Sequence, residues 1–221
     1  MGGLEAFSAI RRQATNMADR SPQSDPITVR PLTSDDWPIV AQLFGANGAC
    51  GGCWCMWWRV PRGGKLWDEC KGDKNRDAFR RLIKAGKVHA ILAFAGEEPI
   101  GWCCFGPRED FVRMKRMRAL QHQSPAGAWA ITCFYIPSRW RGQGVASALL
   151  EAATARAFEL GASAVEGYPK VPKDENTRMP GAFAWTGVPA LFERTGYEEM
   201  EREGDLRPVY ITSRKLRKPA R

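Results

Sequence analysis

Two periods of hydrophobic and polar residues divide this chain into strands and helices. Alternating or short apolar runs predict strands at 27–32, 88–95, 99–105, 128–136, 163–168 and 207–212. Apolar residues at every third or fourth position predict helices over 33–44, 73–86, 145–161 and 188–196. The order β-α-α-β-β-β-α-β-α-β predicts an α+β fold, a central sheet with helices on both faces.

Capping residues indicate where these helices begin and end. Thr33, with Asp36 three residues later, is a variant of the capping box and predicts the start of the first helix. Asp73 is the expected N-cap of the second helix, which Gly86 ends. Gly161 is expected to end the long third helix.

The composition is typical of one soluble domain. Of 221 residues, 44% are hydrophobic and 26% charged, and no apolar run is long enough to span a membrane. We expect one domain at 27–213, a flexible leader at 1–26 and a basic tail at 214–221. The start lacks the apolar core of a secretion signal, so a cytoplasmic protein is expected, with Met1 or Met17 as first residue. Seven cysteines, an odd number, favour reduced thiols.

The net charge of +9 is concentrated in two segments. Five positive charges lie in the last eight residues, and five basic residues lie in the connector 108–118. Such segments bind nucleic acid in some proteins, but a solvated tail and a helix with a solvated basic face explain them equally well. Nucleic-acid binding is therefore disfavoured, and a phosphate-bearing ligand accounts for the modest charge of the body.

The junction between the strand at 128–136 and the long helix carries the clearest chemical signal. Its turn contains Arg139, Arg141, Gly142 and Gly144. A helix start leaves about four backbone N–H groups without partners, glycines let an anion approach them, and arginines add charge-assisted hydrogen bonds. The turn is therefore a candidate phosphate site. It is neither a Walker loop nor a G-x-G-x-x-G dinucleotide motif.

Several segments of the chain resemble one enzyme family. RWRGQG at 139–144 resembles the R/Q-x-x-G-x-G/A motif of the GNAT superfamily of acetyl-CoA-dependent N-acetyltransferases. ITVRPLTSDDW resembles the family's first strand and helix, EEPIGWCCFG its second hairpin, and FERTGY the helix before its last strands. The resemblance implies a mostly antiparallel, splayed sheet, with acetyl-CoA as co-substrate between the strands at 131–136 and 163–168.

The resemblance also implies an acetyl-CoA site, residue by residue. Pantetheine would pair with strand N–H groups near Phe134 and Ile136, and the pyrophosphate would lie on the amides of 141–146. A backbone N–H would hold the developing oxyanion. The residues assigned to acetyl-CoA in this way are Phe134, Ile136, Arg139, Arg141, Gly142, Gln143, Gly144, Val145, Ala146 and Phe192.

Two positions depart from the family pattern. Phe192 stands where members commonly have the Tyr that protonates the leaving thiolate, and Trp185 stands where Asn is common. Another group or water then protonates the sulfur, or catalysis is weak, or the protein only binds an acyl-CoA. Glu166 and Tyr168 share one side of their strand and are candidates for base and acid. The alternative, a solvated charge beside a packed ring, stays open.

The loop GACGGCWCMWWR at 48–59 combines three cysteines with three tryptophans. Its C-x-x-C turn suits structural zinc, but the second half of a zinc site would be one cysteine instead of a pair. It also lacks the strand and helix that surround a thioredoxin-like redox motif. We expect no metal, and the minority zinc hypothesis names Cys50, Cys53, Cys55 and Cys70.

Packing and pocket formation account better for this loop. In the family fold, the segment that joins the first two helices overhangs the acceptor end of the acetyl-CoA cleft. An aromatic pocket there suits an apolar or cationic amine, which contacts the ring faces. The candidate acceptor-binding residues are Trp54, Trp57, Trp58, Trp102 and Trp129, with Trp67 as a further member.

The expected function is therefore transfer of an acetyl group from acetyl-CoA to the primary amine of a small aromatic or hydrophobic molecule. The alternatives are a non-catalytic acyl-CoA-binding or sensor module and a protein amine acetyltransferase. The expected partners are acetyl-CoA and the amine, without a membrane, and a homodimer stays open. His89 and His122, the only histidines, receive no catalytic role.

Overall fold

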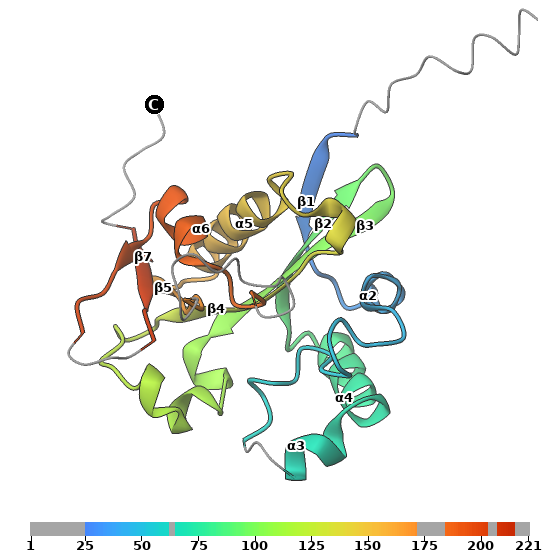
Figure 1. Cartoon of the computed structure of the whole chain (residues 1–221), viewed down its shortest axis with the longest axis horizontal. Helices are drawn as coiled ribbons and strands as arrows, with labels where there is room; N and C mark the ends of the chain where they lie inside the picture. Colours follow the sequence, from blue (N-terminus) through green and yellow to red (C-terminus); the bar gives the residue numbers. More distant parts are fainter. Residues whose placement is uncertain (1–24, 62–64, 172–183, 203–206, 215–221) are drawn as a thin grey trace, which may run out of the picture.

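Strands from both halves of the chain form one mixed sheet in the computed structural model, which describes residues 25–61, 65–171, 184–202 and 207–214. Within these residues the strand order is β1-β2-β3-β4-β5-β7-β6, and only the β4–β5 pair is parallel (Figure 1). The predicted α+β fold with a mostly antiparallel sheet is confirmed. The strands are β1 (Ile27–Pro31), β2 (His89–Ala95), β3 (Glu98–Pro107), β4 (Trp129–Tyr135), β5 (Ala164–Gly167), β6 (Glu198–Glu199) and β7 (Tyr210–Ser213).

The helices follow the predicted order, with one addition. They are α2 (Trp37–Phe44), α3 (Lys65–Cys70), α4 (Asp73–Lys84), α5 (Val145–Glu159) and α6 (Pro189–Arg194). The prediction missed α3, because six residues are too few to establish a helical period. No helix among the described residues is long and apolar enough to cross a membrane.

The basic connector is not the single helix that its charges allowed. It forms three short 3-10 turns, η1 (Arg108–Asp110), η2 (Met114–Arg116) and η3 (Arg118–Leu120). Phe111, Met114 and Leu120 of this segment are buried together with Tyr168. These apolar residues fix the connector against β4 and β5. Most of the predicted leader and tail lies outside the described residues, so the domain limits 27–213 stay a prediction.

Two predicted helix starts move by a few residues. The first helix begins at Trp37. Asp36, expected at N3, is therefore the N-cap residue, and Thr33 lies before the helix. The Thr33 amide, at 2.7 Å, and the Arg30 guanidinium donate to the Asp36 carboxylate. The second helix has Gly72 as its N-cap, with Asp73 as its first residue.

α5 covers one face of the sheet, with α6 beside it (Figure 1). Val145 and Leu149 of α5 are buried against β3. Gly101 of β3 lets the helix approach closely, since a Cβ there would lie 2.8 Å from Val145 Cγ1 and 2.9 Å from Leu149 Cδ1. This close packing fixes the position of the first turn of α5 relative to the strands.

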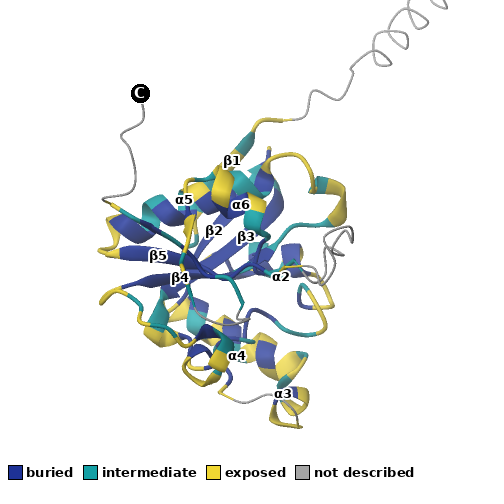
Figure 2. Ribbon diagram, turned by 60° about the vertical axis from the view of Figure 1, so that its left-hand side comes forward, coloured by how far each residue is buried: buried dark blue, intermediate teal, exposed yellow. Residues whose placement is uncertain are grey.

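α2, α4 and the loop at 48–60, which we call the aromatic loop, cover the opposite face (Figure 2). Their core contains Trp102, which contacts the rings of Phe44 and Phe79 edge to face, and Trp37, which packs against Trp54. Buried positions of the sheet therefore lie between two helical layers, as Figure 2 shows.

The parallel strands β4 and β5 separate after a short paired stretch. Trp129, Ala130 and Ile131 pair with β5, and the last pair joins Ile131 to Gly167. The rest of β4 continues without β5 beside it and leads through η4 (Ser138–Trp140) into α5. This opening between the two strands, next to the first turn of α5, is the region in which the sequence predicted the site.

Candidate functional site

The turn before α5 exposes a row of backbone N–H groups. Gly142 and Gly144 adopt left-handed conformations, with φ of 76° and 84°, and a Cβ on either residue would have no neighbour within 4 Å. In the part of the chain that the structure describes, no hydrogen bond occupies the N–H groups of residues 142–147. Together with the dipole of α5, these groups form an anion-binding geometry. We call residues 139–147 the cradle.

Side chains of the cradle mainly hold its shape. Arg139 forms an ion pair with Glu98 of β3. Arg141 Nε donates to the carbonyl of Ile136 at 2.9 Å, and Gln143 donates to the carbonyl of Arg139 at 2.7 Å. The backbone N–H groups are thus the free donors of this turn, and the exposed arginines add positive charge around them.

The amide of Phe134 on β4 already has a partner within the protein. Its N–H donates to the carbonyl of Trp185 at 2.7 Å. The ring of Trp185 lies 5.6 Å from that of Trp58 and 6.4 Å from that of Trp57, measured between centroids. The residues around Trp185 therefore run beside β4 beyond its last pair with β5. The resemblance assigned this same amide to pantetheine, so Trp185 competes for it.

A buried cluster of polar groups lies where β4 and β5 separate. Glu166 Oε2 accepts from the Tyr168 hydroxyl at 2.6 Å, and it lies 3.1 Å from His122 Nε2 and 3.3 Å from Arg108 Nε. Glu166 Oε1 is buried and has no hydrogen-bond partner among the described residues. Glu166 and Tyr168, both fully buried, are thus brought together with a histidine and an arginine.

The protonation of this cluster follows from burial and hydrogen bonding. Burial alone would raise the pKa of Glu166, but hydrogen bonds from His122 and Tyr168 outweigh it and hold the pKa below its usual value. Burial, reinforced by the Glu166 charge, raises the pKa of Tyr168 well above its usual value. The cluster therefore combines an ionised carboxylate with a protonated phenol. Because Glu166 has 0% exposure, it is not the solvated charge of the alternative interpretation.

A comparison with protein families identifies the fold and the chemistry. The model of the acetyltransferase (GNAT) family matches residues 55–180, more than half of the chain. The chain belongs to the GNAT family. No curated protein matches it.

Solved GNAT structures share the fold at low sequence identity. AAC(6')-Ib in complex with paromomycin and acetyl-CoA is 14% identical, with a TM-score of 0.52 over 89% of this chain and 100% of that chain. An N-acetyltransferase from Staphylococcus aureus Mu50 is 11% identical, with a TM-score of 0.51 over 87% of this chain and 100% of that chain. At these identities the two structures establish the fold alone.

This GNAT protein is an acetyl-CoA-dependent N-acetyltransferase. Acetyl-CoA is a thioester whose acetyl group is transferred from sulfur to the nitrogen of an amine. The cradle fits such a donor, because its N–H groups are free and the space over Gly142 and Gly144 is open. Val145 is buried and Ala146 half-buried, so in the cradle they offer backbone N–H groups rather than side chains.

Two tryptophans of the aromatic loop, Trp57 and Trp58, pack near the opening between β4 and β5. Trp58 is buried, and its Nε1 donates to the carbonyl of Thr132 on β4 at 2.9 Å. Trp57 is half-buried and contacts the edge of Trp67, with 5.0 Å between centroids. The Arg113 guanidinium lies 3.8 Å over the ring of Trp57. Trp185, which is not among the candidate acceptor residues predicted from sequence, packs against both rings.

The other candidate tryptophans belong to the core. Trp54 packs against Trp37 and Phe44, and Trp102 is completely buried, with its Nε1 3.2 Å from Cys55 Sγ. Trp129 packs against the rings of His89 and Phe105 on the α5 side of the sheet. Their large apolar rings are enclosed by neighbours, so these three side chains do not line the opening.

The four candidate zinc ligands do not form a metal centre. Cys50 is exposed, Cys53 and Cys70 are half-buried, and Cys55 is buried. The described residues contain no group of three or more His, Cys, Asp or Glu side chains that could hold a metal ion. Burial raises the pKa of the Cys53 thiol, which makes it a poor nucleophile. Neither the zinc nor the redox hypothesis gains support.

Phe192, assigned to acetyl-CoA by position, is completely buried on α6. It packs against Tyr197 and Tyr210, and a Cβ on Gly167 would lie 2.1 Å from its ring. Phe192 therefore fills the space beside β5 instead of presenting a polar group. Tyr168 supplies the buried hydroxyl at the opening, from the opposite side of the same strand.

Proposed function

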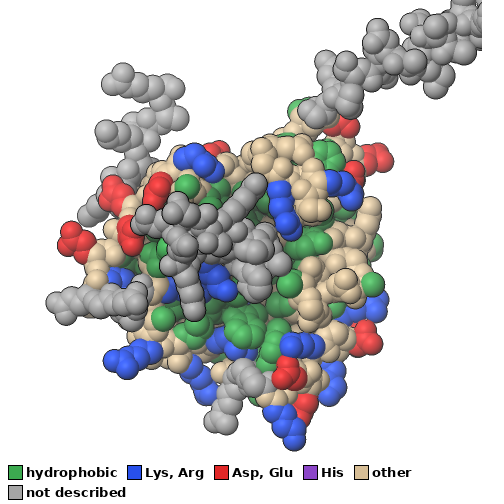
Figure 3. Space-filling model, in the orientation of Figure 1, with side chains coloured by type: hydrophobic (Ala, Val, Ile, Leu, Met, Phe, Trp, Pro, Cys, Tyr) green, Lys and Arg blue, Asp and Glu red, His purple; other side chains and the backbone are tan. Residues whose placement is uncertain are grey.

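We propose that this GNAT enzyme acetylates the primary amine of a small molecule with an aromatic or hydrophobic body. The observation that carries the proposal is that two half-buried rings, Trp57 and Trp185, pack against the same buried cluster as Tyr168, whose hydroxyl donates to Glu166. The rings offer apolar contact, and the carboxylate offers a proton acceptor. In Figure 3, hydrophobic side chains lie between Lys and Arg side chains on this face.

On the donor side, the cradle binds the pyrophosphate of acetyl-CoA and β4 binds its pantetheine arm. The Phe134 N–H then stops donating to the carbonyl of Trp185 and donates to a carbonyl of the pantetheine arm of acetyl-CoA instead. This exchange keeps the strand amide hydrogen-bonded, so its net cost is small. It also moves Trp185 away from Trp58, which enlarges the space for an acceptor.

On the acceptor side, Glu166 removes the ammonium proton and Tyr168 protonates the leaving thiolate. The lowered pKa of Glu166, which burial opposes and hydrogen bonds from His122 and Tyr168 produce, keeps it ionised and able to accept. The raised pKa of Tyr168, caused by burial and by Glu166, keeps its hydroxyl protonated until the thiolate forms. The Tyr168 hydroxyl and Glu166 Oε2 lie 2.6 Å apart, so protonated Glu166 can return a proton to Tyr168.

The charge beside Trp57 narrows the class of acceptor. Arg113 lies 3.8 Å over this ring, and its Nε donates to the carbonyl of Trp57 at 2.6 Å. A cation already occupies the ring face, so the apolar part of the acceptor contacts Trp57 and the ammonium group points away from it. Because the Arg113 cation lies over this ring, polyamines should be poor acceptors.

The test is an acceptor panel with purified protein and acetyl-CoA, in which release of free CoA thiol is measured. The panel contains 2-phenylethylamine, tryptamine, hexylamine, spermidine and a peptide with a free N-terminal alanine. We expect the aromatic amines to have the highest kcat/KM and spermidine the lowest. Turnover of the peptide alone would instead support a protein amine acetyltransferase and refute the small-molecule proposal.

A further inference from the structure

His122, for which the sequence predicts no catalytic role, lies between Glu166 and the surface. It belongs to the segment between η3 and β4, and its side chain is 6% exposed. Its Nδ1 lies 3.0 Å from the carbonyl of Leu120. Its Nε2 lies 3.1 Å from Glu166 Oε2 and 3.1 Å from Ser124 Oγ. One ring thus connects the buried carboxylate to a serine hydroxyl.

These contacts define where the protons of His122 lie. A carbonyl only accepts hydrogen bonds, so Nδ1 carries a proton toward Leu120. The Glu166 carboxylate also only accepts, and the Tyr168 hydroxyl and Arg108 guanidinium beside it favour its ionised form. Both ring nitrogens thus face oxygens that accept hydrogen bonds, which is the arrangement that an imidazolium paired with a carboxylate requires. Glu166 Oε2 is held by these donors, and Oε1 is left as the free basic atom.

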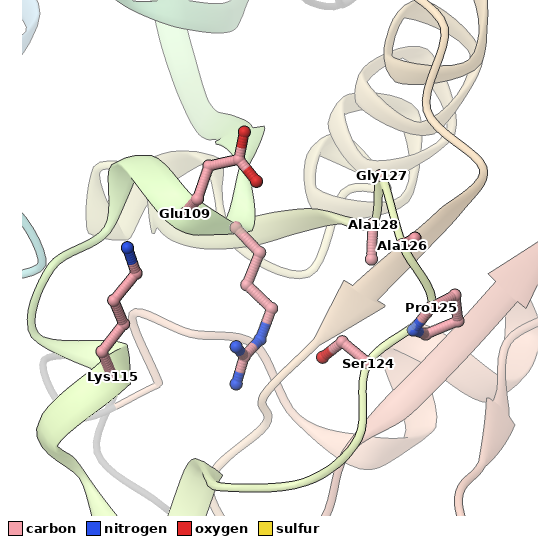
Figure 4. Close-up of a pocket in the computed structure, with 8 residues that line it drawn as sticks. Glu109, Lys115, Ser124, Pro125, Ala126, Gly127 and Ala128 are labelled. Atoms are coloured by element: carbon pink, nitrogen blue, oxygen red, sulfur yellow. The ribbon is translucent and has the colours of Figure 1, made fainter.

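A small surface cavity begins where this chain of groups ends. It has a volume of about 180 Å³, and both Ser124 and Arg108 line it. Figure 4 shows Ser124 across the cavity from Glu109 and Lys115. The volume holds several water molecules, each of which takes about 30 Å³ in the liquid. Ser124 therefore joins His122 to solvent.

The charged groups around His122 come from every segment that packs near it. Glu166 of β5 and Tyr168, directly after β5, face it, and Arg108 of η1 faces the same carboxylate. Glu109 and Lys115 line the cavity. Arg202, from the segment after β6, donates from one guanidinium nitrogen to the carbonyl of Ala119 at 3.0 Å and to that of Gln121 at 3.4 Å. The carboxylate of Glu166 is thus the group that directly stabilises a charge on His122.

We infer that His122 positions Glu166 and conducts its proton to solvent through Ser124. This inference rests on the proposed function, in which Glu166 is the base. The acceptor ammonium gives one proton to Glu166 Oε1, and the imidazolium releases its Nε2 proton through Ser124 to water in the cavity. Rotation of the carboxyl group then brings this proton to Nε2 and restores the ion pair. As the amide forms, the amine nitrogen gives a second proton to Glu166, which passes it to Tyr168 after Tyr168 has protonated the thiolate. One proton passes from ammonium to solvent, and no other reactant is consumed.

The first test does not depend on the acceptor. The chain has two histidines, so selectively ¹⁵N-labelled histidine gives two ring spin systems, which a His89→Gln variant assigns. We expect both ring nitrogens of His122 to be protonated in the wild type, and Nε2 to lose its proton in Glu166→Gln. An Nε2 that is unprotonated in the wild type and unchanged in Glu166→Gln would overturn the ion pair and the relay.

The second test is kinetic, with 2-phenylethylamine as the acceptor. His122→Gln keeps a hydrogen-bonding group but cannot gain or release a proton, so kcat should fall about 10²-fold while the affinity for acetyl-CoA stays unchanged. Added imidazole, which fits the cavity, should restore part of the rate. Ser124→Ala, a milder change, should lower kcat several-fold. His89→Gln is the matched control, because His89 packs against Trp129 and Phe105 away from the site.

Two results separate the relay from the base. If Glu166→Gln is inactive while His122→Gln and Ser124→Ala keep wild-type kcat and show no imidazole effect, His122 has no role in proton transfer and the proposed base stands. If Glu166→Gln keeps wild-type kcat, the proposed base and the relay both fail. Melting curves identify any variant that has lost its fold.

Discussion

The cradle at 139–147 and the aromatic loop at 48–60 build their parts of the site in different ways. The cradle offers backbone N–H groups that any sequence with the same turn would offer. The aromatic loop uses side chains, and the same residue type has three different roles in the tryptophan set. Trp102 fills the core, the Trp58 indole donates to a β4 carbonyl, and Trp57 is half-buried beside Trp185.

Because of this difference, the sequence predicts an anion site but leaves open which tryptophans contact the acceptor. Glycines with positive φ and a helix start specify a backbone anion site from local sequence. The direction in which a tryptophan points depends on contacts with residues far away in the chain. Changes in the cradle should therefore affect acetyl-CoA binding, and changes at the acceptor side should affect turnover or amine binding.

The largest effect should come from Glu166 at the acceptor side. Glu166→Gln removes the proton acceptor, so kcat with 2-phenylethylamine should fall about 10²-fold or more, with no change in acetyl-CoA affinity. Glu159→Gln, on the exposed end of α5, is the control and should behave as the wild type. Steady-state kinetics and calorimetric acetyl-CoA titration measure the two quantities. Loss of acetyl-CoA binding in Glu166→Gln would show that the two sides are not separate.

The next effect separates two tryptophans that sequence alone treats alike. Trp102→Ala empties a fully enclosed position and should lower the free energy of unfolding by about 3–5 kcal/mol. Trp57→Ala removes a half-buried ring, so it should raise KM for 2-phenylethylamine about tenfold, equal to about 1.4 kcal/mol. Denaturant melts and kinetics measure both. An unchanged KM in Trp57→Ala would remove this residue from the acceptor site.

A matched pair of glycines tests the cradle. Gly144 and Gly161 flank α5, with φ of 84° and 97°, and a Cβ on either meets nothing within 4 Å. Alanine at each position should cost a similar, small amount of stability, about 1 kcal/mol, because both need a left-handed conformation. Only Gly144→Ala should weaken acetyl-CoA binding, by about tenfold, because it shifts the N–H groups of the cradle. Equal acetyl-CoA affinities in the two variants would rule out the cradle as the donor site.

The smallest effect is the pH dependence of stability. The pKa of Glu166 in the folded protein is lowered, because hydrogen bonds from His122 and Tyr168 outweigh the opposing effect of burial. Its stabilisation is therefore fully present above the ordinary carboxyl pKa of 4.5 and is lost as the pH falls through the lower folded value. As the pH falls from about 5 to 3, the wild type should therefore lose more stability than Glu166→Gln. Parallel curves in urea melts would contradict this.

The succession of strands and helices along the chain and the glycine-containing turn before α5 could be predicted from sequence, because both depend on residues that are neighbours in the chain. α3 could not, since six residues with one buried side chain, Trp67, carry no period. The role of His122 was also invisible, because it depends on Glu166, which is distant in the chain and adjacent only after β5 is built. The same holds for Trp185, whose carbonyl reaches β4 through a tertiary contact.

Backbone amide shifts during a titration with acetyl-CoA test the central claim most directly, namely that the donor is bound by backbone N–H groups at the start of α5 and on β4. We expect the largest changes at residues 142–147 and at Phe134, whose hydrogen bond to Trp185 is replaced. Trp185 should shift with them, while Trp129 stays unchanged. Saturable binding that leaves residues 142–147 and Phe134 unperturbed would contradict the account.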